Sequence, residues 1–269
     1  MLVDLHLTPR DLAPQALAAA ARSAGLHGVV ITDTNRTDRL SAYVDAAHQA
    51  GLAAYAGVEL ALTRGFLVFI PKVVNPEFLA AGWSAGSGKW APLEAIKACA
   101  AVPGVIIAGH PYCRDLESIL FDHVFTLPNL SAIETRVARG RPLWDAMADD
   151  VATRRNLPRV GSCGGDPAFV GRAVTYVQGE RLSQAGLVDA ILEGNVWPIE
   201  FEARGQSRPH EEEFVEAPRR HDEEGAEGEG GEPRDDDRPR RGPRSDGDRP
   251  RRDGRGGDRG GSRGPRRRD

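Results

Sequence analysis

Residues 28–35 read Gly-Val-Val-Ile-Thr-Asp-Thr-Asn, an apolar, β-rich run that ends in polar side chains. Amphipathic helical patterns lie on both sides of this stretch, over Pro14–Ser23 and Ala42–Ala50. The same alternation of short apolar runs and helical segments continues to about residue 200. Alternation of this kind predicts an α/β fold with a mostly parallel sheet, closed or open, and with helices outside the sheet.

The other predicted strands and helices are assigned from the same two patterns, short apolar runs and amphipathic segments. Strands are expected at Leu2–Leu7, Gly28–Asp33, Ala54–Leu62, Phe66–Ile70, Val105–Gly109, Ala132–Val137, Arg159–Ser162 and Ala173–Val177. Further helices are expected at Leu93–Ala101, Pro142–Arg155 and Ser183–Glu193.

The composition changes sharply near residue 203. The preceding residues are rich in Ala, Val, Leu and Ile, and they are numerous enough to bury one large core. Residues 211–237 then hold 13 acidic residues and 3 arginines, and residues 238–269 hold 13 arginines and 5 aspartates. We therefore expect one folded domain over residues 1–203 and a disordered, acidic-then-Arg/Gly-rich tail over residues 204–269.

No feature of the sequence points to export or to a membrane. The chain shows no secretory signal, and its longest uncharged apolar run, from Ala98 to Gly109, is too short to span a bilayer. Three widely spaced cysteines do not make a disulfide framework. We expect a soluble cytoplasmic protein with no membrane partner.

Polar side chains stand at the ends of the predicted strands, where α/β folds collect their functional groups. They are Asp4, His6, Thr8, Asp33, Thr34, Asn35, Glu59, His110, Glu134, Cys163 and Asp166. Because acids, imidazoles and a thiol gather at one set of strand ends, we predict a functional site there.

Five motifs stand in the order of a known family. They are Asp-Leu-His at 4–6, Gly-Leu-His-Gly-Val-Val-Ile-Thr-Asp-Thr-Asn at 25–35, Gly-Val-Glu at 57–59, Gly-His-Pro-Tyr at 109–112 and Gly-Ser-Cys-Gly-Gly-Asp at 161–166. This order resembles the PHP (polymerase and histidinol phosphatase) family over about residues 1–200. The resemblance implies a distorted (β/α)7 TIM-like barrel. It also implies a cluster of two or three zinc, manganese or iron ions at the strand ends that hydrolyses phosphoesters.

Several ligand positions of the family pattern are substituted in this chain. His6, Glu59 and His110 remain as the metal ligands that the resemblance implies. The substituted positions are Thr8, Thr34, Cys163 and Gly165. We therefore expect a reduced site with at most one or two divalent ions, or none, and Asp33, Cys163 and Asp166 are further candidate ligands.

Two classes of function stay open at this point. The first is a metal-dependent phosphoester hydrolase that acts on a phosphorylated small molecule or a nucleotide. The second is a catalytically inactive barrel, in which His6, Glu59 and His110 form a hydrogen-bonded cluster and the domain serves as a binding or scaffold module. In the second case the Arg/Gly-rich tail could bind RNA without sequence preference. A third interpretation makes Cys163 a nucleophile, activated by a helix that starts at Asp166-Pro167.

Overall fold

The computed structural model describes residues 1–84, 88–113 and 120–201. The predicted tail over residues 204–269 therefore lies outside the described residues. Within these ranges strands and helices alternate, as the sequence pattern predicts. No helix of the described ranges combines the length and the apolar character that crossing a bilayer requires.

One sheet organises the fold. Its nine described strands are hydrogen-bonded in the order β7-β6-β5-β4-β3-β2-β1-β8-β9. The strands are β1 Leu2–Leu7, β2 Gly28–Thr34, β3 Ala53–Ala61, β4 Phe66–Pro71, β5 Gly104–Gly109, β6 Ala132–Val137, β7 Arg159–Ser162, β8 Ala173–Val177 and β9 Val196–Glu200. The β1–β2–β3 and β5–β6–β7 sets pair in parallel, whereas β4 and β8 run against both of their neighbours.

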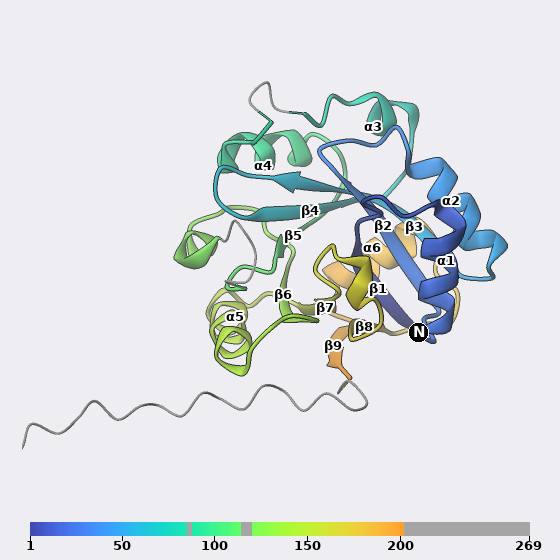
Figure 1. The fold of residues 1–269 in the computed structure, drawn as a ribbon. Coiled ribbons are helices and arrows are strands. Elements are labelled where there is room, and N and C mark those ends of the chain that lie inside the picture. Colours follow the sequence, from blue (N-terminus) through green and yellow to red (C-terminus); the bar gives the residue numbers. More distant parts are fainter. Residues whose placement is uncertain (85–87, 114–119, 202–269) are drawn as a thin grey trace, which may run out of the picture. The chain divides into compact units, whose positions relative to one another are not determined.

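The sheet curls into a nearly closed barrel, with helices around it (Figure 1). The helices are α1 Pro14–Ser23, α2 Leu40–Gln49, α3 Pro76–Ala80, α4 Pro92–Ala100, α5 Pro142–Arg155 and α6 Gln184–Leu192, with short 3-10 helices η1 Phe121–Phe125 and η2 Pro167–Phe169. Leu187 and Ile191 of α6 pack in one buried cluster with Val3, Val30 and Val105 from the strands. This apolar cluster fills the end of the barrel near the starts of the parallel strands.

The barrel closes through the side chain of Thr175 in β8. Its Oγ1 accepts a hydrogen bond from the backbone N–H of Gly161 in β7 (2.9 Å) and donates one to the carbonyl oxygen of Gly161 (2.8 Å). A Cβ atom on residue 161 would lie 2.6 Å from the carbonyl oxygen of Val174. Glycine at 161 and threonine at 175 therefore bring β7 next to β8.

Replacing Thr175 with valine should destabilise this closure. Valine has nearly the same shape but leaves the buried N–H and carbonyl of Gly161 without their partner, which should lower the free energy of unfolding by about 2–4 kcal/mol. Urea unfolding measures the change. Thr135→Val is the matched control, because the buried Oγ1 of Thr135 has no hydrogen-bond partner among the described residues. An equal loss in both variants would contradict a specific role for Thr175.

The predicted fold class is confirmed, since the chain is an α/β barrel. The prediction of a mostly parallel sheet is wrong, because four of the eight pairings among the described strands are antiparallel. The distortion from a regular barrel consists of β4, which is inserted antiparallel between β3 and β5, and of the added β8–β9 pair. Eight strands match the predicted runs to within one or two residues. β9 and α3 have no counterpart among the predicted elements, since β9 contains Pro198, which argues against a strand, and α3 has only five residues.

Candidate metal centre

Two β-bulges aim the central side chains of the site. The register of β1 against β2 shifts after Asp4, so that Leu5 and His6 together oppose one residue of β2. Leu5 therefore packs in the inner core while the next side chain, His6, also points into the barrel. A second register shift follows Glu134 in β6. Bulges re-aim side chains in this way next to functional sites.

His6 bridges two carboxylates across the barrel. Its Nδ1 lies 3.0 Å from Oε1 of Glu134, and its Nε2 lies 2.5 Å from Oε2 of Glu59. All three residues are buried, and His6 has no exposed surface. The imidazole therefore connects β1 to β3 on one side and to β6 on the other.

The two threonines in ligand positions both donate hydrogen bonds to Glu59. Oγ1 of Thr34 lies 2.7 Å from Oε1 of Glu59, and Oγ1 of Thr8 lies 3.4 Å from Oε2. Hydroxyl donors thus stand at two positions for which the sequence resemblance implies imidazole ligands. They satisfy the carboxylate without an ion on this side of the barrel.

Glu134 is satisfied in the same manner. Its Oε1 accepts a hydrogen bond from the hydroxyl of Ser162 (2.6 Å), and its Oε2 accepts one from the backbone N–H of His110 (2.7 Å). The Ser162 hydroxyl in turn accepts the N–H of Gly164 (3.0 Å). Glu134 thereby fixes the start of the loops that follow β5 and β7.

The one positive charge of the cluster, on His6, stabilises the two negative charges beside it. Burial alone would lower the pKa of His6, but the charges and hydrogen bonds of Glu134 and Glu59 raise it to about 10. Burial would raise the pKa of Glu134, yet the paired His6 lowers it to about 2. The pKa of Glu59, which burial would raise, is lowered by its hydrogen bond to His6. The metal-free cluster is therefore an imidazolium held between two carboxylates.

His110 has different properties from His6. Its ring is stacked on that of His6, with centroids 5.6 Å apart and planes inclined by 10°. Burial lowers the pKa of His110 to about 4, which leaves its ring neutral at physiological pH. Its Nδ1 is buried and has no hydrogen-bond partner within the described ranges. The backbone φ of 28° at His110 is strained for a residue with a side chain, as is common at functional sites.

His6, His110 and Glu134 make a set of donors that fits one metal ion. Each offers one ligand atom, and these atoms lie within 4.8 Å of one another. The 3.0 Å between Nδ1 of His6 and Oε1 of Glu134 is close to the edge of about 3.3 Å that a tetrahedron with bonds of about 2.0 Å requires. Nδ1 of His110 has no hydrogen-bond partner among the described residues, and in the tautomer that carries the proton on Nε2 it offers a lone pair. Imidazole and carboxylate donors suit zinc, manganese and iron.

Gly165 closes the other side of the cluster. Its N–H donates to the carbonyl oxygen of His6 (2.9 Å), and its φ is 72°. A Cβ atom there would lie 2.9 Å from Oε2 of Glu59 and 3.0 Å from Nε2 of His6. Main chain thus covers the His6–Glu59 contact, and a side-chain ligand at position 165 has no room in this arrangement.

Asp33 and Asp166, two further candidate ligands, are paired with arginines. Oδ2 of Asp33 lies 2.7 Å from Nε of Arg39. Oδ1 of Asp166 accepts the N–H of Ala168 at the start of η2, as the sequence predicts, and its Oδ2 lies 3.3 Å from Nη1 of Arg139. The structure does not bring these carboxylates together with His6, His110 and Glu134.

Cys163 is a buried thiol at the end of β7. Its Sγ donates to the carbonyl oxygen of His6 (3.0 Å), and its N–H donates to the carboxylate of Asp4 (3.3 Å). Burial and the nearby Asp4 raise the pKa of Cys163 well above 9. The side chain therefore joins the loop after β7 to β1 as a neutral thiol, whereas a nucleophile requires a thiolate.

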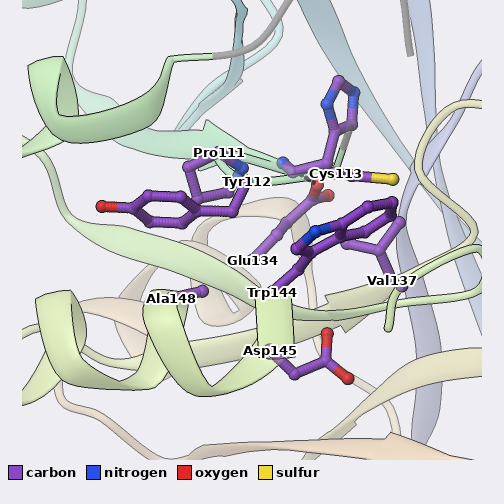
Figure 2. Close-up of a pocket in the computed structure, with 10 residues that line it drawn as sticks. Pro111, Tyr112, Cys113, Glu134, Val137, Trp144, Asp145 and Ala148 are labelled. Carbon is purple, nitrogen blue, oxygen red and sulfur yellow. Dashed lines mark hydrogen bonds between the residues drawn. The ribbon is translucent and has the colours of Figure 1, made fainter. Parts of the chain in front are cut away.

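A narrow hollow of about 10 Å³, enough for about one water molecule, adjoins the candidate ligands. His110 and Glu134 form part of its lining, together with Tyr112, Trp144 and Asp145, and the last two come from the first turn of α5 (Figure 2). The hollow therefore has room for a water molecule beside His110 and Glu134.

Glu134 and Ser162 were not among the predicted ligands or their partners. Glu134 is one of the polar residues at the predicted strand ends. An acidic residue within the predicted strand Ala-Ile-Glu-Thr could have indicated a functional side chain. Ser162 carries no such signal, because a serine near a strand end is common. Its hydrogen bond to Glu134 depends on the barrel that brings β6 and β7 together.

The acid stability of the metal-free protein should depend on His110. Because the pKa of His110 in the folded chain is about 4, below the ordinary 6.5, the unfolded chain binds the proton first as the pH falls. The neutral His110 contributes about 3 kcal/mol to the free energy of unfolding. This contribution is fully present above pH 6.5 and is lost as the pH falls towards 4. Urea unfolding of the metal-free protein between pH 7 and 4 measures it.

His110→Gln is the reference for this measurement. Burial raises the pKa of Asp4 to about 7, so protonation of Asp4 stabilises the folded chain as the pH falls over the same range. Only the difference in the free energy of unfolding between wild type and variant therefore isolates the effect of His110. The wild type should lose stability relative to the variant on acidification. If the difference in the free energy of unfolding between the two proteins did not change with pH, His110 would not be a buried neutral imidazole.

Solved structures support the fold. No protein-family model matches the chain, and no curated protein matches it. A candidate metal-dependent phosphoesterase from Bifidobacterium adolescentis matches with a TM-score of 0.50 and 17% identity, over 72% of this chain and 96% of that chain. An amidohydrolase from Chromobacterium violaceum, with bound sulfate and no metal, matches with a TM-score of 0.50 and 15% identity, over 72% of this chain and 97% of that chain. The barrel is thus a fold that this chain shares with hydrolases.

Proposed function

We propose that this chain is a divergent PHP-type hydrolase that binds one divalent metal ion and cleaves a phosphoester. The observation that carries the proposal is the convergence of His6, His110 and Glu134 at the strand ends, together with the buried Nδ1 of His110, which has no hydrogen-bond partner in the part of the chain that the structure describes. An unpartnered buried nitrogen is costly, and a metal ion would satisfy it. Similarity of the fold to a candidate metal-dependent phosphoesterase supports the same chemistry.

The chain's own residues have distinct parts in this proposal. His6, His110 and Glu134 hold the ion, and Glu59 fixes the ring of His6 through its Nε2. Carboxylate partners of this kind orient a metal-binding imidazole. When bound, the ion supplies Lewis acidity and lowers the pKa of a water molecule. Because Gly165 covers the Glu59 side of the cluster, one ion rather than a cluster of ions is proposed.

A second candidate function is a barrel without catalysis that acts as a binding module. The saturated carboxylates favour it, since Glu59 and Glu134 accept hydrogen bonds from His6 and from the hydroxyls of Thr34 and Ser162. The imidazolium of His6 then takes the place of a cation. Under this candidate, non-specific RNA binding by the arginine-rich residues 238–269 remains a proposal from sequence.

Hydrolysis assays with the reconstituted full-length chain test the proposed function. The protein is loaded with zinc, manganese or iron(II) and incubated with p-nitrophenyl phosphate and bis(p-nitrophenyl) phosphate. We expect turnover that depends on the metal and that falls in Glu134→Gln, which keeps the shape of the side chain but loses the anionic ligand. A chain that binds metal but cleaves neither ester would overturn the proposal.

A further inference from the structure

Phe66 places an aromatic ring at the polar end of the barrel. It is the first residue of β4, and it pairs with Ala61 at the end of β3 and with Gly109 at the end of β5. Because β4 runs against both of these neighbours, its start lies beside their ends. The antiparallel insertion of β4 therefore brings the first residue of a strand to the end of the barrel where the candidate metal ligands lie.

The side chain of Phe66 faces the inside of the barrel. Alternate residues of a strand share a face, so Phe66 lies on the same face as Val68 and Ile70. These two residues belong to the inner apolar cluster, whereas Leu67 and Phe69 belong to the other hydrophobic cluster. Phe66 is half-buried and is part of neither cluster of the described residues. Its ring is thus placed for a contact outside the hydrophobic core.

That contact is with the imidazole of His110. The two ring centroids lie 5.1 Å apart with planes inclined by 60°, which is the edge-to-face arrangement that aromatic pairs favour. His110 also stacks on the ring of His6. A Cβ atom built on Gly109 would lie 3.5 Å from Cβ of Phe66 and 3.7 Å from Cε1 of His6. Phe66 and His6 therefore approach β5 at the same point, directly before His110.

The ring of His110 depends on such contacts for its orientation. A carboxylate orients the ring of His6, since Glu59 lies next to its Nε2. At His110 the neighbouring carboxylate, Glu134, accepts the backbone N–H and so fixes the main chain. Nδ1 of His110 has no hydrogen-bond partner in the ranges that the structure describes. Packing on His6 and Phe66 takes the place of the hydrogen bond that orients His6.

We propose that Phe66 is a positioning residue for the candidate metal centre, and that its ring holds the imidazole of His110 in the orientation that metal binding requires. The inference rests on the proposed function for the bound ion, whereas the contact between the two rings belongs to the metal-free chain. Phe66 offers no ligand atom of its own. A side chain without an aromatic ring would let His110 rotate, so metal binding would have to order the imidazole and would become weaker.

Competition with a chromogenic chelator for zinc tests this role in the full-length chain. Phe66→Leu keeps an apolar side chain but has no aromatic ring, and it should weaken zinc binding about tenfold, at the lower end of the range for residues that orient a ligand. Phe66→Tyr keeps the ring and should restore the affinity to within about twofold of wild type. Phe125→Leu is the control, because Phe125 is an exposed phenylalanine in η1.

Nuclear magnetic resonance of the metal-free chain adds a readout that a general loss of stability would not change. The ring protons of His110, assigned by their absence in His110→Asn, should change chemical shift in Phe66→Leu but not in Phe125→Leu. Unchanged His110 signals in Phe66→Leu, or wild-type zinc affinity in that folded variant, would overturn the inference. Equal weakening in Phe66→Tyr and Phe66→Leu would also overturn it, since the ring would then not be what acts.

The same measurements separate this inference from the proposed function. A wild-type chain that binds zinc tightly, together with a Phe66→Leu variant that binds it equally well, refutes the positioning role alone. A wild-type chain that binds no zinc, manganese or iron(II) refutes the proposed function and the positioning role with it. In that case the His110 signals still report whether the two rings are in contact.

Discussion

Replacing His110 with alanine is expected to abolish tight metal binding. His110 supplies the one buried side-chain nitrogen that has no partner in the described part of the chain, so its loss removes a ligand that no neighbouring side chain replaces. Loss of a residue that only supports a ligand already costs about 10- to 100-fold in metal affinity, and loss of the ligand itself should exceed that range. Competition with a chromogenic chelator measures the affinity.

Folding and metal binding must be separated in this experiment. The φ of 28° at His110 disfavours alanine, whereas asparagine tolerates positive φ values. His110→Asn should therefore fold at least as well as His110→Ala and should lose the metal equally. His48→Ala removes an exposed imidazole on α2 and should leave the affinity unchanged. Wild-type affinity in a folded His110→Asn protein would rule out His110 as a ligand.

Replacing Gly165 with alanine should cause the second large effect. The φ of 72° is unfavourable for any residue with a Cβ atom, and this atom would press on the buried Oε2 of Glu59 and Nε2 of His6. We expect the free energy of unfolding to fall by about 3 kcal/mol, of which about 1 kcal/mol comes from the unfavourable backbone conformation alone. Thermal and urea unfolding measure the change.

Gly25→Ala provides the matched control. Gly25 has a φ of 77°, and a Cβ atom there would meet nothing within 4 Å. Its replacement should cost only the backbone part, about 1 kcal/mol. The excess in Gly165→Ala therefore reports how closely the loop after β7 packs on the cluster. Equal losses at the two positions would show that the loop does not lie on His6 and Glu59.

Periodicity predicts the barrel well because its strands and helices obey local rules. The positions of His6 and His110 near the ends of predicted strands also indicate that they are neighbours, because the carboxyl ends of parallel strands lie at the same edge of the sheet. In the structure their rings are stacked. The extra residues that the bulges introduce have no sequence signature. The pairing of Glu134 with His6 across the barrel depends on these bulges, so the sequence alone cannot rank Glu134 above Glu59 as a ligand.

Arginine contacts explain why other candidate ligands stand apart. Asp33 near the end of β2 pairs with Arg39, which lies only six residues later, just before α2, so a local signal was present in the sequence. Asp166 meets Arg10 and Arg139 from distant segments, and only the closed barrel brings these together. The substitutions at Thr8 and Thr34 have a physical reason that the sequence does not show, namely hydrogen bonds to Glu59.

Elemental analysis of the full-length chain tests the central proposal most directly. The protein is purified without added metal or chelator and is measured again after incubation with zinc, manganese or iron(II) and removal of the excess. The arrangement of His6, His110 and Glu134 predicts one divalent ion per chain. No bound ion after reconstitution would contradict the proposed function and would leave the metal-free His6–Glu59–Glu134 cluster as the state of this barrel.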